Sequence, residues 1–184
     1  MQEPLAAAPV TGDIWLFAYG SLVWNPLVTF AERRVITVHG FHRRFCMWSL
    51  INRGMPEDPG LVLGLDHGGC CTGVAYRPLA ADVEAELRLL WRREMPLGIY
   101  RPRWLTAADA AGPLPALGFA VLRSGPSYAG RLSDDAVVEC LCRTVGKLGR
   151  GIDYLRNTID GLAQAGITDA HLLRLDALAR ARGI

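Results

Sequence analysis

The residue with the clearest chemical potential is Glu94, which closes a stretch of apolar residues with helical spacing. Val83, Leu87 and Leu90 stand at i, i+4 and i+7, and Glu94 follows at i+11 on the same stripe. Glutamate on an apolar face is rare unless it is paired or functional. Burial raises the pKa of a carboxyl above about 4.3, toward the range useful for proton transfer. Glu94 is therefore a candidate general acid–base; the alternative is a boundary glutamate paired with a nearby arginine.

A second candidate is the tetrapeptide Tyr19-Gly20-Ser21-Leu22, which follows an apolar run. A buried strand that ends in Gly-Ser leaves backbone N–H groups without ladder partners, and these can bind a carboxylate or a carbonyl oxygen. Glycine also lets a ligand approach the backbone closely. An ordinary strand-ending turn is the alternative. A nucleophilic Ser21 is disfavoured, because a nucleophile elbow needs glycine where Val23 stands.

Two further loops carry side chains that suit a zwitterionic ligand. Arg53 lies in the turn-rich segment 52–60 and is a candidate partner for a carboxylate, which arginine binds in a bidentate manner. Tyr128 lies in Ser127-Tyr128-Ala129-Gly130 and offers a hydroxyl. A solvated surface arginine and a packed loop tyrosine are the respective alternatives.

The cysteines do not suggest a catalytic or metal-binding role. Their odd number argues against a disulfide framework, and neither their spacing nor that of the four histidines fits a zinc site. We expect buried structural thiols at Cys46, Cys70, Cys71, Cys140 and Cys142, and no metal.

The elements that must position these residues change in type along the chain. Short apolar runs between turn formers predict strands over 14–19, 35–49, 61–65, 72–77, 99–105 and 116–123. A bend is expected at Gly40, and a turn at Asp66–Gly69. Helical spacing predicts helices over 81–94, 134–148, 152–165 and 169–182. Ser133 is a candidate N-cap and Gly166 a candidate C-cap. The order predicts a mixed sheet with segregated helices, an α+β protein.

Composition limits the classes of partner. The 184 residues are 51% hydrophobic and 21% charged, which predicts one globular domain over 1–184 with residues 1–12 as a loose leader. A net charge of +2 gives no case for nucleic acid. Neither a signal peptide nor the ~18 apolar residues of a membrane span is visible. We expect a soluble cytoplasmic protein, most simply a monomer, with a small-molecule substrate and no membrane partner.

Seven segments follow one another along the chain with plausible gaps: Phe17-Ala18-Tyr19-Gly20-Ser21-Leu22-Val23-Trp24-Asn25-Pro26, Gly40-Phe41-His42-Arg43-Arg44-Phe45, Arg53-Gly54 through Val62, Gly73-Val74-Ala75-Tyr76, Arg93-Glu94 through Tyr100, Pro126 through Gly130, and Asp153-Tyr154-Leu155 through Asp169. Taken in this order, they resemble the ChaC-like glutathione-specific γ-glutamylcyclotransferases. The match spans roughly residues 15–175. Asn52 and Met55 stand where the family has His and Thr, and Ile99 replaces a glycine.

The resemblance implies a fold, a reaction and roles. The fold is a mixed α/β one, a small, mainly antiparallel β-barrel with flanking helices. The reaction converts glutathione into 5-oxoproline and cysteinylglycine by attack of the α-amino group on the γ-carbonyl, without a cofactor. Glu94 is the implied acid–base, and Tyr19–Leu22, Arg53 and Tyr128 are the implied substrate contacts. A cyclotransferase for other γ-glutamyl amines, or a non-catalytic binding module, are the alternatives.

Overall fold

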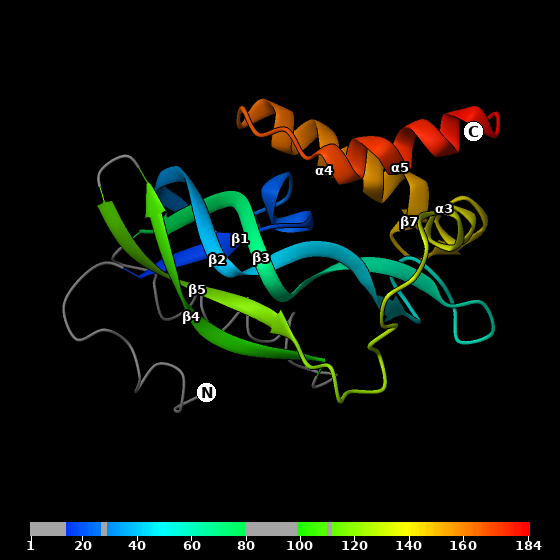
Figure 1. Cartoon of the computed structure of the whole chain (residues 1–184), viewed down its shortest axis with the longest axis horizontal. Helices are drawn as coiled ribbons and strands as arrows, with labels where there is room; N and C mark the ends of the chain where they lie inside the picture. The colour runs from blue at the N-terminus through cyan, green and yellow to red at the C-terminus, as the bar shows by residue number, and fades with distance from the viewer. Residues whose placement is uncertain (1–13, 27–28, 80–98, 110–111) are drawn as a thin grey trace.

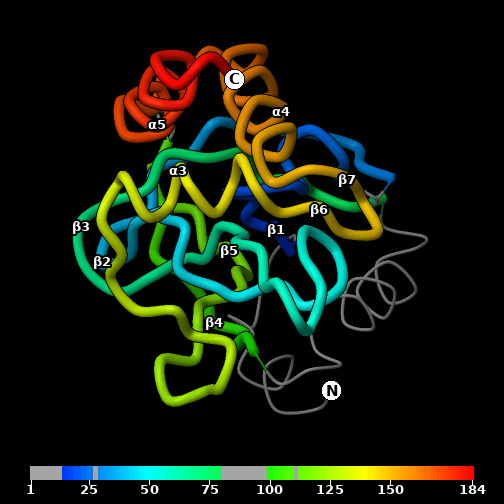
Figure 2. Tube along the Cα trace, turned by 90° about the vertical axis from the view of Figure 1, so that its right-hand side faces the viewer, coloured from blue at the N-terminus to red at the C-terminus, as the bar shows by residue number. Residues whose placement is uncertain are grey.

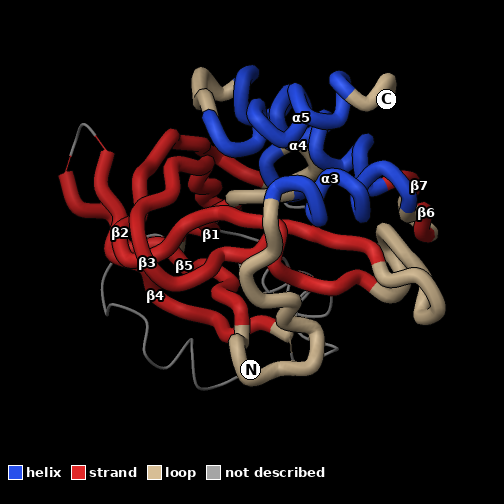
Figure 3. The backbone as a smooth tube through the Cα atoms, turned by 45° about the vertical axis from the view of Figure 1, so that its right-hand side comes forward, coloured by secondary structure: helices blue, strands red, loops and turns tan. Residues whose placement is uncertain are grey.

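The computed structural model describes residues 14–26, 29–79, 99–109 and 112–184. In this part of the chain, strands close into a barrel in the order β1-β3-β2-β4-β5, and helices gather over one side of it (Figures 1 and 3). The barrel strands are β1 Trp15–Ala18, β2 Phe30–Ser49, β3 Gly60–Pro78, β4 Tyr100–Asp109 and β5 Gly112–Val121. Their pairing is antiparallel except where β5 meets β1 and β3. The expected α+β class, with a small and mainly antiparallel barrel, is confirmed.

The helical layer comes from the end of the chain. It consists of α3 Asp134–Arg143, α4 Gly151–Gln164 and α5 Ala170–Ala181, with a small hairpin of β6 Val145–Gly146 and β7 Gly149–Arg150 between the first two helices. Figure 2 shows α4 and α5 above the barrel. A 3-10 helix, η1 Ser21–Val23, follows β1. Within the described residues, no helix has the length and hydropathy needed to cross a membrane.

The apolar run at 14–19 is explained by burial on both sides of β1. Leu16 and Ala18 belong to the core shared with the helices, whereas Trp15, Phe17 and Tyr19 belong to a second core inside the barrel. A strand covered on both faces loses the alternation of apolar and polar residues that a half-exposed strand shows. The predicted strand is therefore confirmed.

One prediction about the β2–β3 region is wrong. Two strands joined by a turn at Asp66–Gly69 were expected, but β3 is continuous and pairs with β2 along almost all its length. Gly68 and Gly69 have φ values of 104° and 70°, and Gly40 opposite them has 82°. The pairing passes from His39↔Cys70 to Phe41↔His67 across this point. The glycines thus form a bulge in both strands, and only the expected bend at Gly40 is confirmed.

The β4–β5 hairpin is longer than the sequence predicts. Strands were expected over 99–105 and 116–123 with a Pro/Gly-rich loop between them, but pairing runs out to Asp109↔Gly112. Pro113 and Pro115 belong to β5 at a level where β1 no longer pairs with it, since that pairing begins at Ala116. Proline is tolerated best at the edge of a sheet, and among the described residues β4 is the only strand that pairs with Pro113 and Pro115.

The three helices predicted for the C-terminal third are confirmed, and so is the N-cap Ser133, whose side chain accepts a hydrogen bond from the Ala136 N–H. The C-cap of α4 is Ala165, and the predicted Gly166 is the residue directly after it, with a φ of 74°. The first of these helices was expected to reach residue 148 but ends at Arg143, where β6 and β7 take over. The predicted helix 81–94 and the predicted leader 1–12 lie outside the described residues.

Candidate active site

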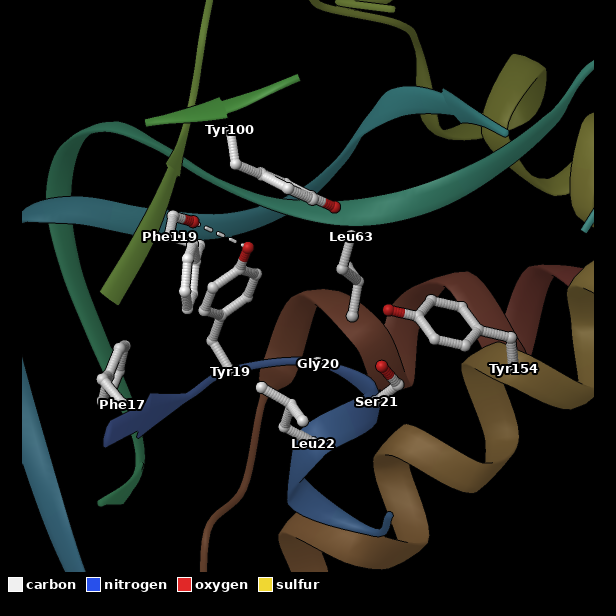
Figure 4. A pocket seen from close by; sticks show the side chains of 9 residues that line it. All are labelled: Phe17, Tyr19, Gly20, Ser21, Leu22, Leu63, Tyr100, Phe119 and Tyr154. Carbon is white, nitrogen blue, oxygen red and sulfur yellow. Dashed lines mark hydrogen bonds between the residues drawn. The ribbon is translucent and has the colours of Figure 1, made fainter. Parts of the chain in front are cut away.

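A pocket opens where β1 ends and η1 begins. It is lined by Phe17, Tyr19, Gly20, Ser21, Leu22, Leu63, Tyr100, Phe119 and Tyr154. Figure 4 shows the β1–η1 connection along one wall, with Tyr154 of α4 and Tyr100 of β4 approaching from other sides. All four residues of the predicted segment Tyr19–Leu22 therefore line one pocket. Its cavity volume of about 40 Å³ is room for a few water molecules, which suits one end of a substrate.

Hydrogen bonds hold the segment in place from three sides. The Tyr19 hydroxyl donates to the Phe119 carbonyl at 2.9 Å, and the Tyr76 hydroxyl donates to the Val23 carbonyl at 3.1 Å. The Trp24 Nε1–H donates to Thr158 Oγ1 at 3.2 Å. The barrel and α4 thus fix both ends of η1, and a rigid segment of this kind can hold a ligand without a large ordering cost.

Gly20 is needed at this wall because of space. An added Cβ would lie 2.9 Å from the Tyr154 hydroxyl oxygen and 3.6 Å from Leu63 Cβ. The Gly20 N–H donates no hydrogen bond to another of the described residues. A ligand carboxylate or carbonyl oxygen could accept that hydrogen bond, which is the chemistry expected from the sequence.

The described wall of the pocket contains no charged side chain. Tyrosine and serine hydroxyls can orient a ligand, but they are poor proton acceptors at neutral pH. A proton transfer at this pocket therefore needs a group beyond the nine lining residues. Glu94, the candidate for that role, lies outside the described residues, so its role stays a prediction.

Arg53 lies behind the pocket wall. It is only 6% exposed, so the alternative of a solvated surface arginine is wrong. Its guanidinium stacks over the Tyr154 ring at 5.2 Å, and Nη1 donates to the carbonyls of Leu148 (2.5 Å) and Arg150 (3.3 Å). Burial lowers the pKa of Arg53. The structure therefore links Arg53 to the pocket through Tyr154, and direct contact with a substrate stays a prediction.

Tyr128 also lies outside the pocket lining. Its hydroxyl donates to Asp66 Oδ2 at 2.9 Å, and Arg123 Nε donates to Asp66 Oδ1 at 2.7 Å. Asp66 is fully buried. Burial raises the pKa of this carboxyl, but the hydrogen bonds from Arg123 and Tyr128 outweigh burial and hold the pKa below its usual range. The structure thus gives Tyr128 a partner in the fold, whereas a contact with substrate stays a prediction.

Residues from distant segments complete the pocket and were not predicted as site residues. Tyr154, Tyr100, Leu63 and Phe119 come from α4, β4, β3 and β5. Tyr100 and Tyr154 stand within two of the segments that carry the family resemblance, and this was a usable signal. Leu63 and Phe119 look like ordinary strand residues in the sequence, because only the closure of the barrel brings them to η1.

The thiols are mostly buried, as expected, with one exception. Cys46, Cys71 and Cys140 are buried and Cys142 is half-buried, but Cys70 is exposed beside the β3 bulge. Burial raises the pKa of Cys46 to about 12 and that of Cys71 to about 11. Because the thiolate is the nucleophilic form, these two groups are unreactive at neutral pH.

Comparisons with known proteins agree with this geometry. The family model described as "ChaC-like protein" matches residues 14–182. The glutathione-specific gamma-glutamylcyclotransferase of Escherichia coli K12 is 37% identical over 166 residues, which are 90% of this chain and 72% of that protein. Human glutathione-specific gamma-glutamylcyclotransferase 1 is 35% identical, over 86% and 75% of the two chains.

A solved structure shows the same fold. The crystal structure of a yeast gamma-glutamylcyclotransferase specific to glutathione superimposes with a TM-score of 0.83 at 20% identity, covering 93% of this chain and 97% of that one. Since the family model spans nearly the whole chain and two relatives exceed 30% identity over most of it, this chain belongs to the ChaC-like protein family.

Proposed function

We propose that this chain is a glutathione-specific γ-glutamylcyclotransferase, which releases 5-oxoproline and cysteinylglycine from glutathione. The observation that carries the proposal is the Tyr19–Leu22 segment lining a small pocket in a member of this family. The relatives in Escherichia coli and human carry this activity in their names. Room for a few water molecules suits a small polar group at one end of the substrate, such as the α-carboxylate of the γ-glutamyl group.

The reaction is a ring closure. The α-amino nitrogen of the γ-glutamyl group attacks its own γ-carbonyl carbon, so a new C–N bond forms and the bond to the cysteine nitrogen breaks. The attacking nitrogen must lose two protons, one from the ammonium before the attack and one after the new C–N bond has formed, and the departing nitrogen must gain one to leave as an amine. We propose that the Glu94 carboxylate accepts a proton from the attacking nitrogen and passes it to the leaving nitrogen, while the other proton is released to the solvent. The atoms balance without water, metal or an organic cofactor.

The pocket contributes orientation. An extended γ-glutamyl chain must fold back before its nitrogen can reach its own carbonyl, and holding it in that shape removes much of the entropic barrier. We propose that the backbone donors of Gly20–Leu22 hold the substrate's oxygens, and that the same donors stabilise the oxyanion that develops on the γ-carbonyl. In this scheme Arg53 and Tyr128 remain proposed substrate contacts. The cytoplasmic location and monomeric state also stay predictions.

The test is a product assay. Purified protein, without added metal, is incubated with glutathione, and 5-oxoproline and cysteinylglycine are measured by mass spectrometry. Parallel reactions contain γ-glutamyl-ε-lysine or oxidised glutathione. We expect equal amounts of both products from glutathione. Turnover of γ-glutamyl-ε-lysine with none of glutathione would assign the chain to a different substrate, and a heat of binding without product would make it a binding module.

A further inference from the structure

We propose that Arg43 is a positioning residue for the substrate segment, because it fixes the peptide group between Tyr19 and Gly20. The inference rests on the proposed function and adds to it a residue that lies outside the pocket lining. Arg43 is on β2 and is 7% exposed. A buried arginine is uncommon and is kept where its hydrogen bonds are satisfied.

The guanidinium of Arg43 joins three parts of the fold. Nη1 donates to the Tyr19 carbonyl at 2.9 Å, Nη2 donates to the Thr72 carbonyl at 2.5 Å, and Nε donates to Asp169 Oδ2 at 2.9 Å. The guanidinium is planar and its N–H groups have fixed directions, so the three acceptors are held in fixed positions relative to one another. The end of β1 is thereby attached to β3 and to the start of α5.

Asp169 fixes Arg43 in turn. Its other oxygen, Oδ1, accepts hydrogen bonds from the N–H groups of His171 and Leu172, both at 3.1 Å, at the N-terminus of α5. The helix therefore holds the carboxylate in place, and we expect the carboxylate to keep its position when Arg43 is replaced. The Arg43–Asp169 ion pair, with the Arg43 side chain only 3% exposed, is an anchor between the helical layer and the barrel.

The contact at Tyr19 has a consequence for Gly20. The carbonyl of Tyr19 and the N–H of Gly20 belong to the same planar peptide group, and in a trans peptide they point in opposite directions. When Arg43 holds the carbonyl, it also sets the direction of the N–H. That N–H meets no protein acceptor among the described residues, and Gly20 lines the pocket. Arg43 therefore determines how this donor is presented to a ligand.

Other contacts keep the segment folded when Arg43 is replaced. The Tyr19 hydroxyl remains bonded to Phe119, and η1 remains bonded to Tyr76 and to Thr158. Loss of Arg43 is thus expected to leave the pocket in place but to free the rotation of one peptide group. Misplacement of a binding group by about 1 Å can cost about 10²-fold in rate.

The test compares Arg43→Lys and Arg43→Gln with Arg156→Gln. Arg156 is the matched control, since its Nε bonds to Asp176 at 2.9 Å and its Nη2 to the Ile184 carbonyl at 2.7 Å, away from the pocket. We expect kcat/KM for glutathione to fall about 10–100-fold in Arg43→Gln, mainly through KM. We expect a smaller loss in Arg43→Lys and activity within about twofold of wild type for Arg156→Gln.

A readout without turnover separates this proposal from the proposed function. The carbonyl-carbon NMR shift of Tyr19 and the amide-nitrogen shift of Gly20 report the hydrogen bond to that peptide, and both should move in Arg43→Lys and not in Arg156→Gln. If wild type does not cleave glutathione but these shifts move, the proposed function fails and the positioning role of Arg43 stands. Unmoved shifts, or kcat/KM within threefold of wild type in Arg43→Gln, would overturn the positioning role.

One further variant covers the case in which Arg43→Gln does not fold. Asp169→Asn keeps the cap on α5, because asparagine caps helices about as well as aspartate, but it removes the charge that holds Arg43 Nε. We expect the same shift changes at Tyr19 and Gly20, with a loss in kcat/KM smaller than that of Arg43→Gln. Unchanged kinetics and shifts in both Asp169→Asn and Arg43→Lys would also overturn the proposal.

Discussion

A Cβ atom added to Gly20 would lie 2.9 Å from the hydroxyl oxygen of Tyr154, at the wall of the pocket. Real Cβ atoms are almost never found so close to another heavy atom. Tyr154 cannot move away easily, because Phe45 and Trp24 pack edge-on against its ring and Arg53 stacks over it. The pair Gly20 and Tyr154 therefore sets the width of the pocket at this point.

The first prediction follows from that contact. Gly20→Ala should lower kcat/KM for glutathione by about tenfold or more, since the added methyl displaces either the segment or the tyrosine. Ser21→Ala keeps the backbone N–H and should stay within threefold of wild type. In a Gly20→Ala, Tyr154→Phe double variant the clashing oxygen is gone, so we expect part of the loss to be recovered. The measurement is a double-mutant cycle in kcat/KM.

Two results would contradict this picture. A folded but inactive Ser21→Ala protein would point to the hydroxyl and reopen the possibility of a serine nucleophile. The change in kcat/KM can be expressed as a change in activation free energy for each variant. If the change in the double variant equals the sum of the changes in the two single variants, Gly20 and Tyr154 act independently and the contact does not set the pocket width.

The second prediction concerns the hydrogen bond between Tyr128 and the buried Asp66. Tyr128→Phe removes one donor to a buried carboxylate, and we expect the free energy of unfolding to fall by about 1–3 kcal/mol. Thermal unfolding and glutathione kinetics, measured on the same variant, show which role the hydroxyl has. If Tm falls while kcat and KM stay within threefold of wild type, the Tyr128 hydroxyl stabilises the fold and does not contact the substrate. A tenfold rise in KM at unchanged Tm would show the contact with substrate that the sequence predicts.

The third prediction gives the pH dependence of stability that Asp66 causes. The pKa of Asp66 is lower in the folded protein than in the unfolded chain, where it is about 3.9. The carboxylate therefore stabilises the fold fully at a pH above the unfolded pKa, and this stabilisation is lost as the pH falls through the folded pKa. Asp66→Asn should therefore lower Tm at pH 7, and the gap to wild type should narrow below about pH 4. A gap that stays constant from pH 7 to pH 3 would contradict this account of the carboxylate.

The fourth prediction is that no thiol takes part in the reaction. The raised pKa values of Cys46 and Cys71, about 12 and 11, leave both protonated at neutral pH. Iodoacetamide at pH 7.5 should modify Cys70 first, because its side chain is exposed, and should leave turnover of glutathione intact. Mass spectrometry of the labelled protein, with a Cys70→Ala control, tests this. Loss of turnover in parallel with labelling of wild type, but not of Cys70→Ala, would contradict it.

Strands could be predicted from the sequence where their own residues determine the structure, as in β1, whose apolar run requires burial on both sides. The sequence was insufficient where the neighbouring strand determines whether a segment forms a turn or a bulge. Gly68-Gly69 has the composition of a turn, and it is a bulge only because Gly40 lies opposite it in a second bent strand. The same holds for Pro113 and Pro115, whose described strand partner is β4 alone.

The site shows the same division between local and long-range information. Tyr19–Leu22 could be singled out because a glycine directly after a buried strand can leave backbone donors without ladder partners, and the structure places these four residues on one pocket wall. The partners of Tyr128 could not, since Asp66 stands 62 residues away along the chain. Nor could the anchoring of Tyr19 by Arg43, which depends on a contact with Asp169, 126 residues beyond the arginine.

The last prediction concerns Glu94, which stands in line with Val83, Leu87 and Leu90 in the sequence. The pocket wall described above has no charged side chain, so the proton transfers of the proposed reaction require a group of this kind. Glu94→Gln keeps the shape of the side chain but cannot accept a proton. Removal of a general base costs about 10²–10⁴-fold in rate, and we expect at least that loss in kcat, because one carboxylate serves both the attacking and the leaving nitrogen.

Substrate binding separates this effect from misfolding. Glutamine still fills the site, so the Kd for glutathione measured by calorimetry should stay within about threefold of wild type, and Tm should hold or rise, since an uncharged amide is less costly to bury than a carboxylate. Glu84→Gln is the matched control, because residue 84 lies off the apolar stripe, and it should be fully active. If Glu94→Gln turns over glutathione within threefold of wild type, the assignment is wrong. Glu57, exposed in the loop after Arg53, is then the next carboxylate to replace.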